Sequence, residues 1–386
     1  MDFDLSKSQR LLKQSARELL ARECKPERVR RAMAAESAWD AALWQTIADQ
    51  GWTALIVPEA HAGLALGVVE LAAVAEETGR VCMPGPFLST VLATAIVSRH
   101  GSAEQQARYL EPIAAGEMKA TAAVLEKSAT WDLDAIRCGA PLNRATFVIS
   151  GEKHFVTDAE AADVIFCVAR SGEGLVVLPV PKTAAGLTIR RTASMDETRK
   201  VCVVNFDNVS VEQRNAMYAD ATSLGRAIDI ATVALCAEMV GGMQWVLETT
   251  VEYAKTRQQF GRAIGSFQAV QHQCADMVLL TESSRSATYY AAWALTHDDP
   301  AARAAVSIAK SYCSDAYREV ANRGVQVHGG IGFTWEHDLQ MYYKRAKASE
   351  TLFGDATFHR ERIASIVVDR DVQLPAPEPA RMTEAQ

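Results

Sequence analysis

The chain has 386 residues, enough to bury a large core and to form two or three lobes. Its net charge of −7 weighs against a nucleic-acid-binding protein, because phosphate binding normally needs a basic face. The eight cysteines include no CxxC pair, and no apolar run approaches the ~20 residues of a membrane span. With an N-terminus that is polar rather than signal-like, these features predict a cytoplasmic enzyme without a membrane segment or a metal site.

Residues 1–119 are predicted to form a helical domain. Leu11 and Leu19 are among the apolar residues that recur there at helical spacing. Ser102 is a predicted N-cap, and Gln105, three residues later, completes a capping box. We therefore expect a helix to begin directly after Ser102.

Residues 120–218 have the apolar runs and the Gly and polar turns that are typical of a small β-domain. Helical patterns return over 219–371, and the proline-rich residues 372–386 are predicted to be a disordered tail. Because no strand–GxGxxG–helix unit occurs, this order favours the α+β class over a doubly wound fold. The predicted strands are Phe147–Thr157, Val164–Ala169, Leu175–Pro179 and Val201–Phe206.

Two motifs in the last third of the chain are its most informative part. Tyr253–Gly261 contains Arg-Gln-Gln-Phe-Gly, and Gln326–Gly332 reads Gln-Val-His-Gly-Gly-Ile-Gly. Their order and spacing resemble the C-terminal signatures of the acyl-CoA dehydrogenase family, and the likeness runs from Met1 to about Asp369. The resemblance implies an N-terminal helical domain, a central β-barrel-like domain and a C-terminal four-helix bundle. It also implies FAD as cofactor, an acyl-CoA substrate and tetramers built from dimers.

The resemblance implies that the two motifs bind one end of FAD. In the family these segments lie at a subunit boundary and hold the pyrophosphate and adenosine of the neighbouring subunit's FAD. A guanidinium pairs well with phosphate oxygens, and adjacent glycines let backbone N–H groups approach a phosphate. For Arg257 alone, an ion pair with Glu248 or Glu252 is the simpler alternative. The candidate residues are Arg257, Gln259, Phe260, Gln326, Gly329 and Gly330.

The segment Gly151–Thr157 resembles the family stretch that covers the isoalloxazine ring of the flavin. By that resemblance Phe155 stands where the family has a tryptophan, and an aromatic side chain there can stack on the ring. Thr157 stands at the threonine whose hydroxyl meets flavin N5 and steadies the reduced ring by a hydrogen bond. The alternative is an ordinary alternating strand in which both side chains point inward.

The stretch Ala122–Asp132 departs from the family pattern for the FAD cradle. Leu125 replaces a threonine that reaches the flavin pyrimidine, and Trp131 replaces a serine that lines the region between FAD and thioester. Ser128 and Thr130 replace two glycines, so we expect the loop to lose backbone conformations with positive φ. These exchanges predict a remodelled cradle that binds FAD substoichiometrically or only with a partner subunit.

Both family positions for the catalytic base lack a carboxylate. The base removes an α-proton while the β-hydride passes to the flavin, and burial raises the pKa of such a carboxylate toward neutrality. Resemblance places the commoner position at Gly354 and the rarer one at Ala231. Glu238 shares a helix face with Ala231, and Asp355 directly follows the other position, so these acids are the candidates for a relocated base. The simpler alternatives are a buried ion pair for Glu238 and a helix N-cap for Asp355.

The leading prediction is a FAD-associated subunit of an enzyme that desaturates an acyl-CoA thioester between its α and β carbons. A paralogous partner in a hetero-tetramer supplies the base, and electron-transferring flavoprotein is the acceptor that the family implies. The Leu-Phe-Gly-Asp of Leu352–Asp355 is typical of a subset that includes subunits of heteromeric steroid-side-chain and pimeloyl-CoA-type dehydrogenases. Two alternatives stay open, a self-sufficient homo-oligomeric dehydrogenase with a relocated base and a non-catalytic scaffold.

Overall fold

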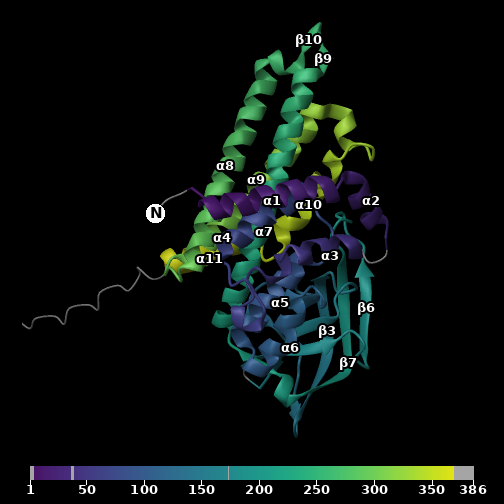
Figure 1. Ribbon diagram of the computed structural model, residues 1–386, viewed down its shortest axis with the longest axis vertical. Coiled ribbons are helices and arrows are strands. Elements are labelled where there is room, and N and C mark those ends of the chain that lie inside the picture. The colour runs from purple at the N-terminus through teal and green to yellow at the C-terminus, as the bar shows by residue number, and fades with distance from the viewer. Residues whose placement is uncertain (1–3, 36–38, 173, 369–386) are drawn as a thin grey trace, which may run out of the picture.

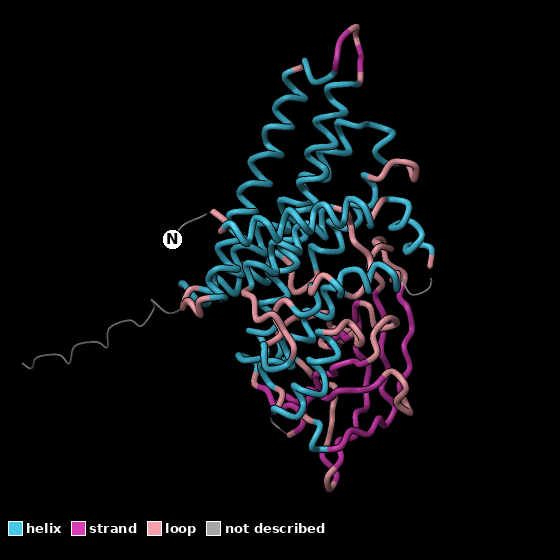
Figure 2. Tube along the Cα trace, in the orientation of Figure 1, coloured by secondary structure: helices cyan, strands magenta, loops and turns pink. Residues whose placement is uncertain are grey.

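The computed structural model describes residues 4–35, 39–172 and 174–368. Helices come first, strands occupy 120–219, and helices return from residue 221, interrupted by one short hairpin. This order confirms the predicted α+β class with a central β part. Figure 2 shows the strands of the β part gathered toward one end of the molecule and the long C-terminal helices reaching the other. The predicted tail at 372–386 lies outside the described residues.

The N-terminal part consists of helices whose apolar faces pack on one another. Ser102 begins α6 with the predicted capping box: its hydroxyl accepts from the Gln105 N–H, and the Gln105 side chain accepts from the Ser102 N–H. Leu19 is buried as the helical spacing indicates, whereas Leu11 is exposed, so the buried face of α1 is narrower than its leucines suggest. The helices are α1 (Lys7–Glu23), α2 (Pro26–Ala34), α3 (Ala41–Asp49), α4 (Val68–Arg80), α5 (Phe87–His100) and α6 (Ala103–Ala114).

The central part is built from two four-stranded sheets that share an apolar core. One sheet has the order β1-β4-β5-β8 and the other β2-β3-β7-β6. Strand β4 is buried on both faces: Val164 and Phe166 belong to the helical core, while Ile165 and Cys167 belong to the core between the sheets. This double burial explains why β4 reads as a continuous apolar run. The strands are β1 (Ala120–Ala123), β2 (Leu142–Asn143), β3 (Thr146–Thr157), β4 (Val164–Ser171), β5 (Gly174–Pro181), β6 (Leu187–Thr192), β7 (Val201–Glu212) and β8 (Met217–Ala219).

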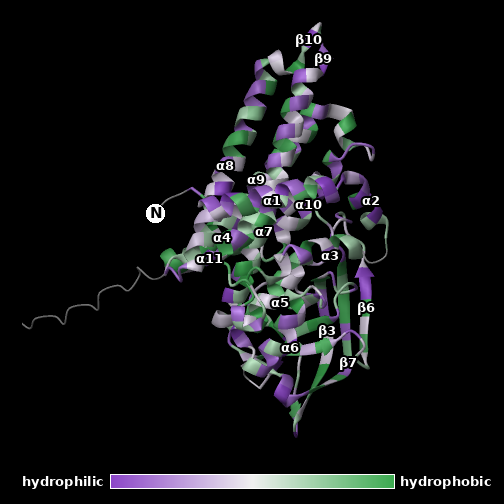
Figure 3. Ribbon diagram, viewed as in Figure 1, coloured by the Kyte–Doolittle hydropathy of each residue, from purple (hydrophilic) through white to green (hydrophobic). Residues whose placement is uncertain are grey.

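The C-terminal part is a helical bundle around α7 (Ala221–Thr256). Among the described helices, α7 alone has the length and composition of a membrane span, but 83% of its apolar window is buried inside the protein, as in a core helix. Figure 3 shows hydrophobic residues gathered around α5, beside the middle of the molecule. The remaining elements are β9 (Gln258–Gln259), β10 (Arg262–Ala263), α8 (Gln268–Thr296), α9 (Ala302–His328), α10 (Leu339–Thr351) and α11 (Ala356–Val367).

Helices α4 and α7 cross closely because glycines stand at the contact. A Cβ added at Gly79 would lie 1.8 Å from the Glu238 carbonyl oxygen, and one added at Gly241 would lie 1.8 Å from the Glu76 carbonyl oxygen. Only a residue without a side chain permits this approach. The crossing fixes the middle of α7, including Glu238, against the N-terminal helices.

Candidate active site

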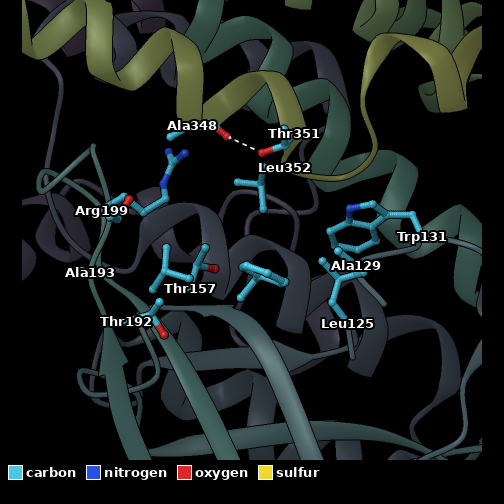
Figure 4. Close-up of a pocket in the computed structure, with 13 residues that line it drawn as sticks. Leu125, Ala129, Trp131, Thr157, Thr192, Ala193, Arg199, Ala348, Thr351 and Leu352 are labelled. Atoms are coloured by element: carbon cyan, nitrogen blue, oxygen red, sulfur yellow. Dashed lines mark hydrogen bonds between the residues drawn. The ribbon is translucent and has the colours of Figure 1, made fainter. Parts of the chain in front are cut away.

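A cavity of about 360 Å³ lies where the sheet that contains β3 meets the end of α10. Most of its lining atoms are apolar, and the lining side chains come from the three regions that Figure 4 displays. The first is the loop after β1, the second is the sheet edge formed by β3, β6 and the start of β7, and the third is the end of α10. The lining residues are Leu125, Ala129, Trp131, Phe155, Thr157, Thr192, Ala193, Ser194, Arg199, Val201, Ala348, Thr351 and Leu352.

An irregularity in β3 turns Phe155 toward this cavity. The pairing of β3 with β7 shifts register between Lys153 and Val156, and Phe155 has φ +54°. The Phe155 side chain is 46% exposed and lines the cavity together with Thr157. The alternating-strand alternative is therefore wrong for Phe155, because the bulge interrupts the alternation before that residue.

The loop after β1 presents Leu125 and Trp131 to the cavity. The Trp131 ring packs edge-on against Phe353 with centroids 5.3 Å apart, which joins this loop to the segment after α10. Glu126 fixes the loop from behind by accepting hydrogen bonds from the Cys138 N–H at 2.7 Å and from Lys153 Nζ at 2.9 Å. Neither exchanged position, Ser128 nor Thr130, has positive φ; Ala129 between them has φ +56°, a conformation that is less favourable for alanine than for glycine.

Glu238 lies behind the cavity wall in a buried ion-pair cluster. Both of its carboxylate oxygens accept from Arg199 Nη2 at 2.7 Å, and one also accepts from Arg345 Nη1. Arg345 Nε in turn donates to Asp196 at 2.8 Å. Glu238 is 7% exposed and does not line the cavity. This placement favours the ion-pair alternative, because the carboxylate is bound by two guanidinium groups and does not line the cavity.

The segment after α10 offers no carboxylate to the cavity either. Asp355 is exposed and caps α11, where its carboxylate accepts from the Phe358 N–H at 2.8 Å. Gly354 has φ +100°, and a Cβ added there would lie 2.4 Å from the Phe358 ring. Lys310 Nζ holds the same turn by donating to the Gly354 carbonyl oxygen at 2.7 Å. Ala231, the other family base position, is buried inside α7.

A buried carboxylate that sequence reasoning missed follows Thr157 directly. Burial raises the pKa of the Asp158 carboxyl to about 6, in the range that a general base needs. Its carboxylate, however, accepts a hydrogen bond from Ser89 Oγ at 2.8 Å, and the residue does not line the cavity. Asp158 therefore belongs to the packing between α5 and β3.

The two C-terminal motifs, Tyr253–Gly261 and Gln326–Gly332, lie beside each other toward the far end of the long helices. Figure 1 shows the β9–β10 hairpin at the tip of α7 and α8, away from the sheets. Arg257 and Gln259 are exposed, and Phe260 is 91% exposed at φ +55°. Tyr253, near the end of α7, stacks on His328 at the end of α9 with ring centroids 4.4 Å apart, which brings the second motif beside the first.

The polar groups of this tip are available to a ligand. No hydrogen bond or ion pair joins the Arg257 side chain to another residue within the described ranges, because Glu248 pairs with Arg80 and Glu252 pairs with Lys255. A Cβ added at either Gly329 or Gly330 would meet no atom within 4 Å. Gln326 is exposed as well. The six candidate residues thus lie on a solvent-exposed surface near the tip of the long helices. Within one chain this surface is separate from the cavity.

Comparison with known proteins identifies the family. Models of the N-terminal, middle and C-terminal domains of acyl-CoA dehydrogenases match residues 6–117, 121–209 and 223–368. The chain belongs to the acyl-CoA dehydrogenase family, whose members are FAD-dependent oxidoreductases acting on CH–CH bonds of acyl-CoA.

Curated and solved relatives extend over almost the whole chain. The acyl-CoA dehydrogenase IpdE2 of Mycolicibacterium smegmatis is 31% identical over 353 residues, which cover 91% of this chain and 96% of the relative. Cyclohex-1-ene-1-carbonyl-CoA dehydrogenase of Geobacter metallireducens is 31% identical over 312 residues, 78% of this chain and 82% of the relative. The ChsE4–ChsE5 complex from Mycobacterium tuberculosis contains a chain with a TM-score of 0.88 and 28% identity, covering 97% of this chain and all of that one.

The residues around the cavity fit the family's FAD. Two polar atoms of its lining residues, Arg199 Nη1 and Thr192 Oγ1, are buried without a hydrogen-bond partner among the described residues, as expected for groups that bind a ligand. Phe155 and Trp131 add aromatic surface for a flat ring, and Thr157 adds a hydroxyl. When bound, the flavin supplies the acceptor for a hydride.

Proposed function

We propose that this chain is the FAD-associated subunit of a heteromeric acyl-CoA dehydrogenase, and that a paralogous partner supplies the catalytic base. One observation carries the proposal: within the described ranges, no carboxylate lines the cavity, and Arg199 is its one ionisable lining residue. Desaturation requires loss of an α-proton to a positioned base, because bulk water removes such a proton too slowly. The chain's own cavity lacks the group for that step.

Each residue of the cavity has a role in binding rather than in proton transfer. Phe155 and Trp131 would provide aromatic contact for a flavin ring, Thr157 would provide a hydroxyl donor, and Leu125 belongs to the apolar part of the lining. Because Leu125 and Trp131 replace polar and small residues of the family pattern, the cavity holds FAD through shape and apolar contact more than through hydrogen bonds. We therefore expect the lone chain to bind FAD substoichiometrically, and the assembled complex to bind it fully.

The tip of the long helices completes a second FAD site across a subunit boundary. Arg257 holds phosphate, Gln259 and Phe260 contact the nucleotide end, and the backbone of the second motif approaches the pyrophosphate. What supports this division is that the open tip lies at the end of the long helices away from the sheets (Figure 1), whereas the cavity lies between the β3 sheet and the end of α10. A dimer places the tip of one subunit beside the cavity of the other. Electron-transferring flavoprotein in the cytoplasm would be the electron acceptor of the complex.

The experiment that tests this function is co-expression with candidate paralogues that carry an intact glutamate at the family base position. We expect a stable hetero-oligomer that desaturates acyl-CoA. Activity should vanish when the partner's base glutamate is changed to glutamine, and should persist in the Asp355→Asn variant of this chain. If the complex retains full activity without the partner's glutamate, the proposal that the partner supplies the catalytic base is wrong. A complex that never binds FAD would instead support a scaffold role.

Arg257→Ala should lower the affinity for FAD while leaving the fold intact. A charge-assisted hydrogen bond contributes on the order of 1.5–3 kcal/mol, so the dissociation constant should rise roughly tenfold or more. Titration of the apo-complex with FAD measures the effect. Lys255→Ala is the matched control, because Lys255 is also exposed on this tip but already pairs with Glu252 at 2.6 Å. Equal affinities for the two variants would remove Arg257 from the FAD site.

A further inference from the structure

We propose that Arg199 anchors an oxygen atom of the molecule that occupies the cavity. Arg199 lines the cavity and is only 7% exposed, and its Nη1 group has no acceptor among the described residues. A buried guanidinium N–H without an acceptor loses its hydrogen bonds to water and gains nothing in return. At the wall of a cavity, a ligand or an ordered water supplies the acceptor for such a donor.

The other side of the guanidinium explains why this donor is fixed in place. Nη2 of Arg199 donates to both oxygens of Glu238, and Nη1 of Arg345 donates to one of the same two oxygens. Arg345 is itself held by Asp196, at 2.8 Å, and by Thr198 Oγ1, at 2.9 Å from Nε. The cluster therefore pairs two arginines with two carboxylates. Because the two carboxylates balance the charges of the two arginines, Arg199 Nη1 serves the cavity as a fixed hydrogen-bond donor and adds no unbalanced positive charge.

A second unpartnered group strengthens the assignment. Thr192 Oγ1, at the end of β6, is also buried without a hydrogen-bond partner within the described part of the chain, and Thr192 lines the same cavity. Figure 4 shows Thr192 and Arg199 on one side of the cavity, with Trp131 and Leu125 on the other. One wall thus carries the polar groups and the facing wall is apolar. This asymmetry suits a ligand with its oxygen atoms along one edge.

The ligand chemistry is a carbonyl-type oxygen acceptor. Two molecules of the proposed reaction carry one, the flavin ring and the acyl thioester, so the assignment rests on the proposed function. A carbonyl accepts well from a guanidinium N–H, and each hydrogen bond to a charged group contributes more than a neutral one. The sequence does not indicate a role for Arg199, because an arginine between a polar loop and a strand is normally exposed to solvent.

The test is the Arg199→Lys variant in the complete flavoprotein complex. Lysine keeps the ion pair with Glu238. Because its side chain has only one nitrogen, it has no second nitrogen to place where Arg199 Nη1 meets the cavity. We measure the dissociation constants of FAD, with the apo-complex, and of acetoacetyl-CoA and octanoyl-CoA, with the oxidised holo-complex. Arg191→Lys is the matched control, because Arg191 adjoins Thr192, pairs with Glu160 at 2.9 Å and does not line the cavity.

If the dissociation constant of FAD rises tenfold or more, the oxygen acceptor belongs to the flavin. If only the dissociation constants of the thioesters rise by that factor, the acceptor belongs to the acyl group. Constants within twofold of wild type in both arms overturn the proposal. If the wild-type complex binds FAD but neither thioester, the dissociation constant of FAD alone tests the proposal. If Arg199→Lys does not fold, the double variant R199M/E238Q replaces it, with the same criteria. Wild-type complex that binds no FAD would refute the proposed function itself.

Discussion

Gly354→Glu should destabilise the protein and should not create a working base. The residue has φ +100°, a conformation that L side chains rarely adopt, and its Cβ would lie 2.4 Å from the Phe358 ring and 3.0 Å from His359 Nε2. Backbone strain and this clash together should cost roughly 2–5 kcal/mol of the free energy of unfolding. The turn has no freedom to yield, because Lys310 and His359 both donate to its carbonyl oxygens, at 2.7 and 2.9 Å. Denaturant unfolding of the purified variant measures the loss.

Gly225→Glu is the matched control for this substitution. Gly225 lies in the first turns of α7, and a Cβ added there would meet no atom within 4 Å. Since glutamate is a better helix former than glycine, this control should be neutral or slightly stabilising. A Gly354→Glu protein as stable as wild type, with a flavin that acyl-CoA reduces, would show that the position still accepts a base.

Glu238→Ala should cost about 3–5 kcal/mol of stability, because it leaves Arg199 and Arg345 buried without their shared carboxylate. Glu238→Gln should cost less, since the amide oxygen still accepts from one guanidinium. Glu248→Ala is the control on the same helix: Glu248 pairs with Arg80 near the surface, where an ion pair contributes less than about 1 kcal/mol.

The Glu238→Gln variant also separates the two roles that the sequence left open. If Glu238 were a relocated base, the variant would keep its stability and lose flavin reduction by acyl-CoA. A structural Glu238 gives the opposite pattern, a lower stability with flavin reduction retained in the assembled complex. The three charge-assisted hydrogen bonds from two arginines to Glu238 predict the second pattern.

Local sequence patterns were enough to predict the order of the fold. The capping box at Ser102 and the apolar run of β4 are local signals, and both elements form as expected. Strands β1, β2, β6 and β8 were not predicted; β2 and β8 have only two and three residues and carry no periodicity. Leu11 was misleading because a single apolar residue can face solvent even inside a helix, as Leu11 does within α1.

The candidate site was predictable only where the family register supplied it. Leu125, Trp131, Phe155 and Thr157 line one cavity, although their roles toward FAD stay predictions. Arg199 could not be found from the sequence, because its burial depends on Glu238, 39 residues away, and on the packing of α10. Likewise, no sequence pattern shows that Gly354 has positive φ, which depends on how the turn meets α11.

The most direct test of the central claim is anaerobic mixing of this chain alone, loaded with FAD, with saturated acyl-CoA thioesters of several chain lengths. The visible absorbance of the flavin is followed before and after addition of the paralogous partner. Because no carboxylate of the described chain lines the cavity, we expect no bleaching with the lone chain and rapid bleaching once the partner is present. Efficient bleaching by the lone chain would contradict the claim that the partner supplies the base.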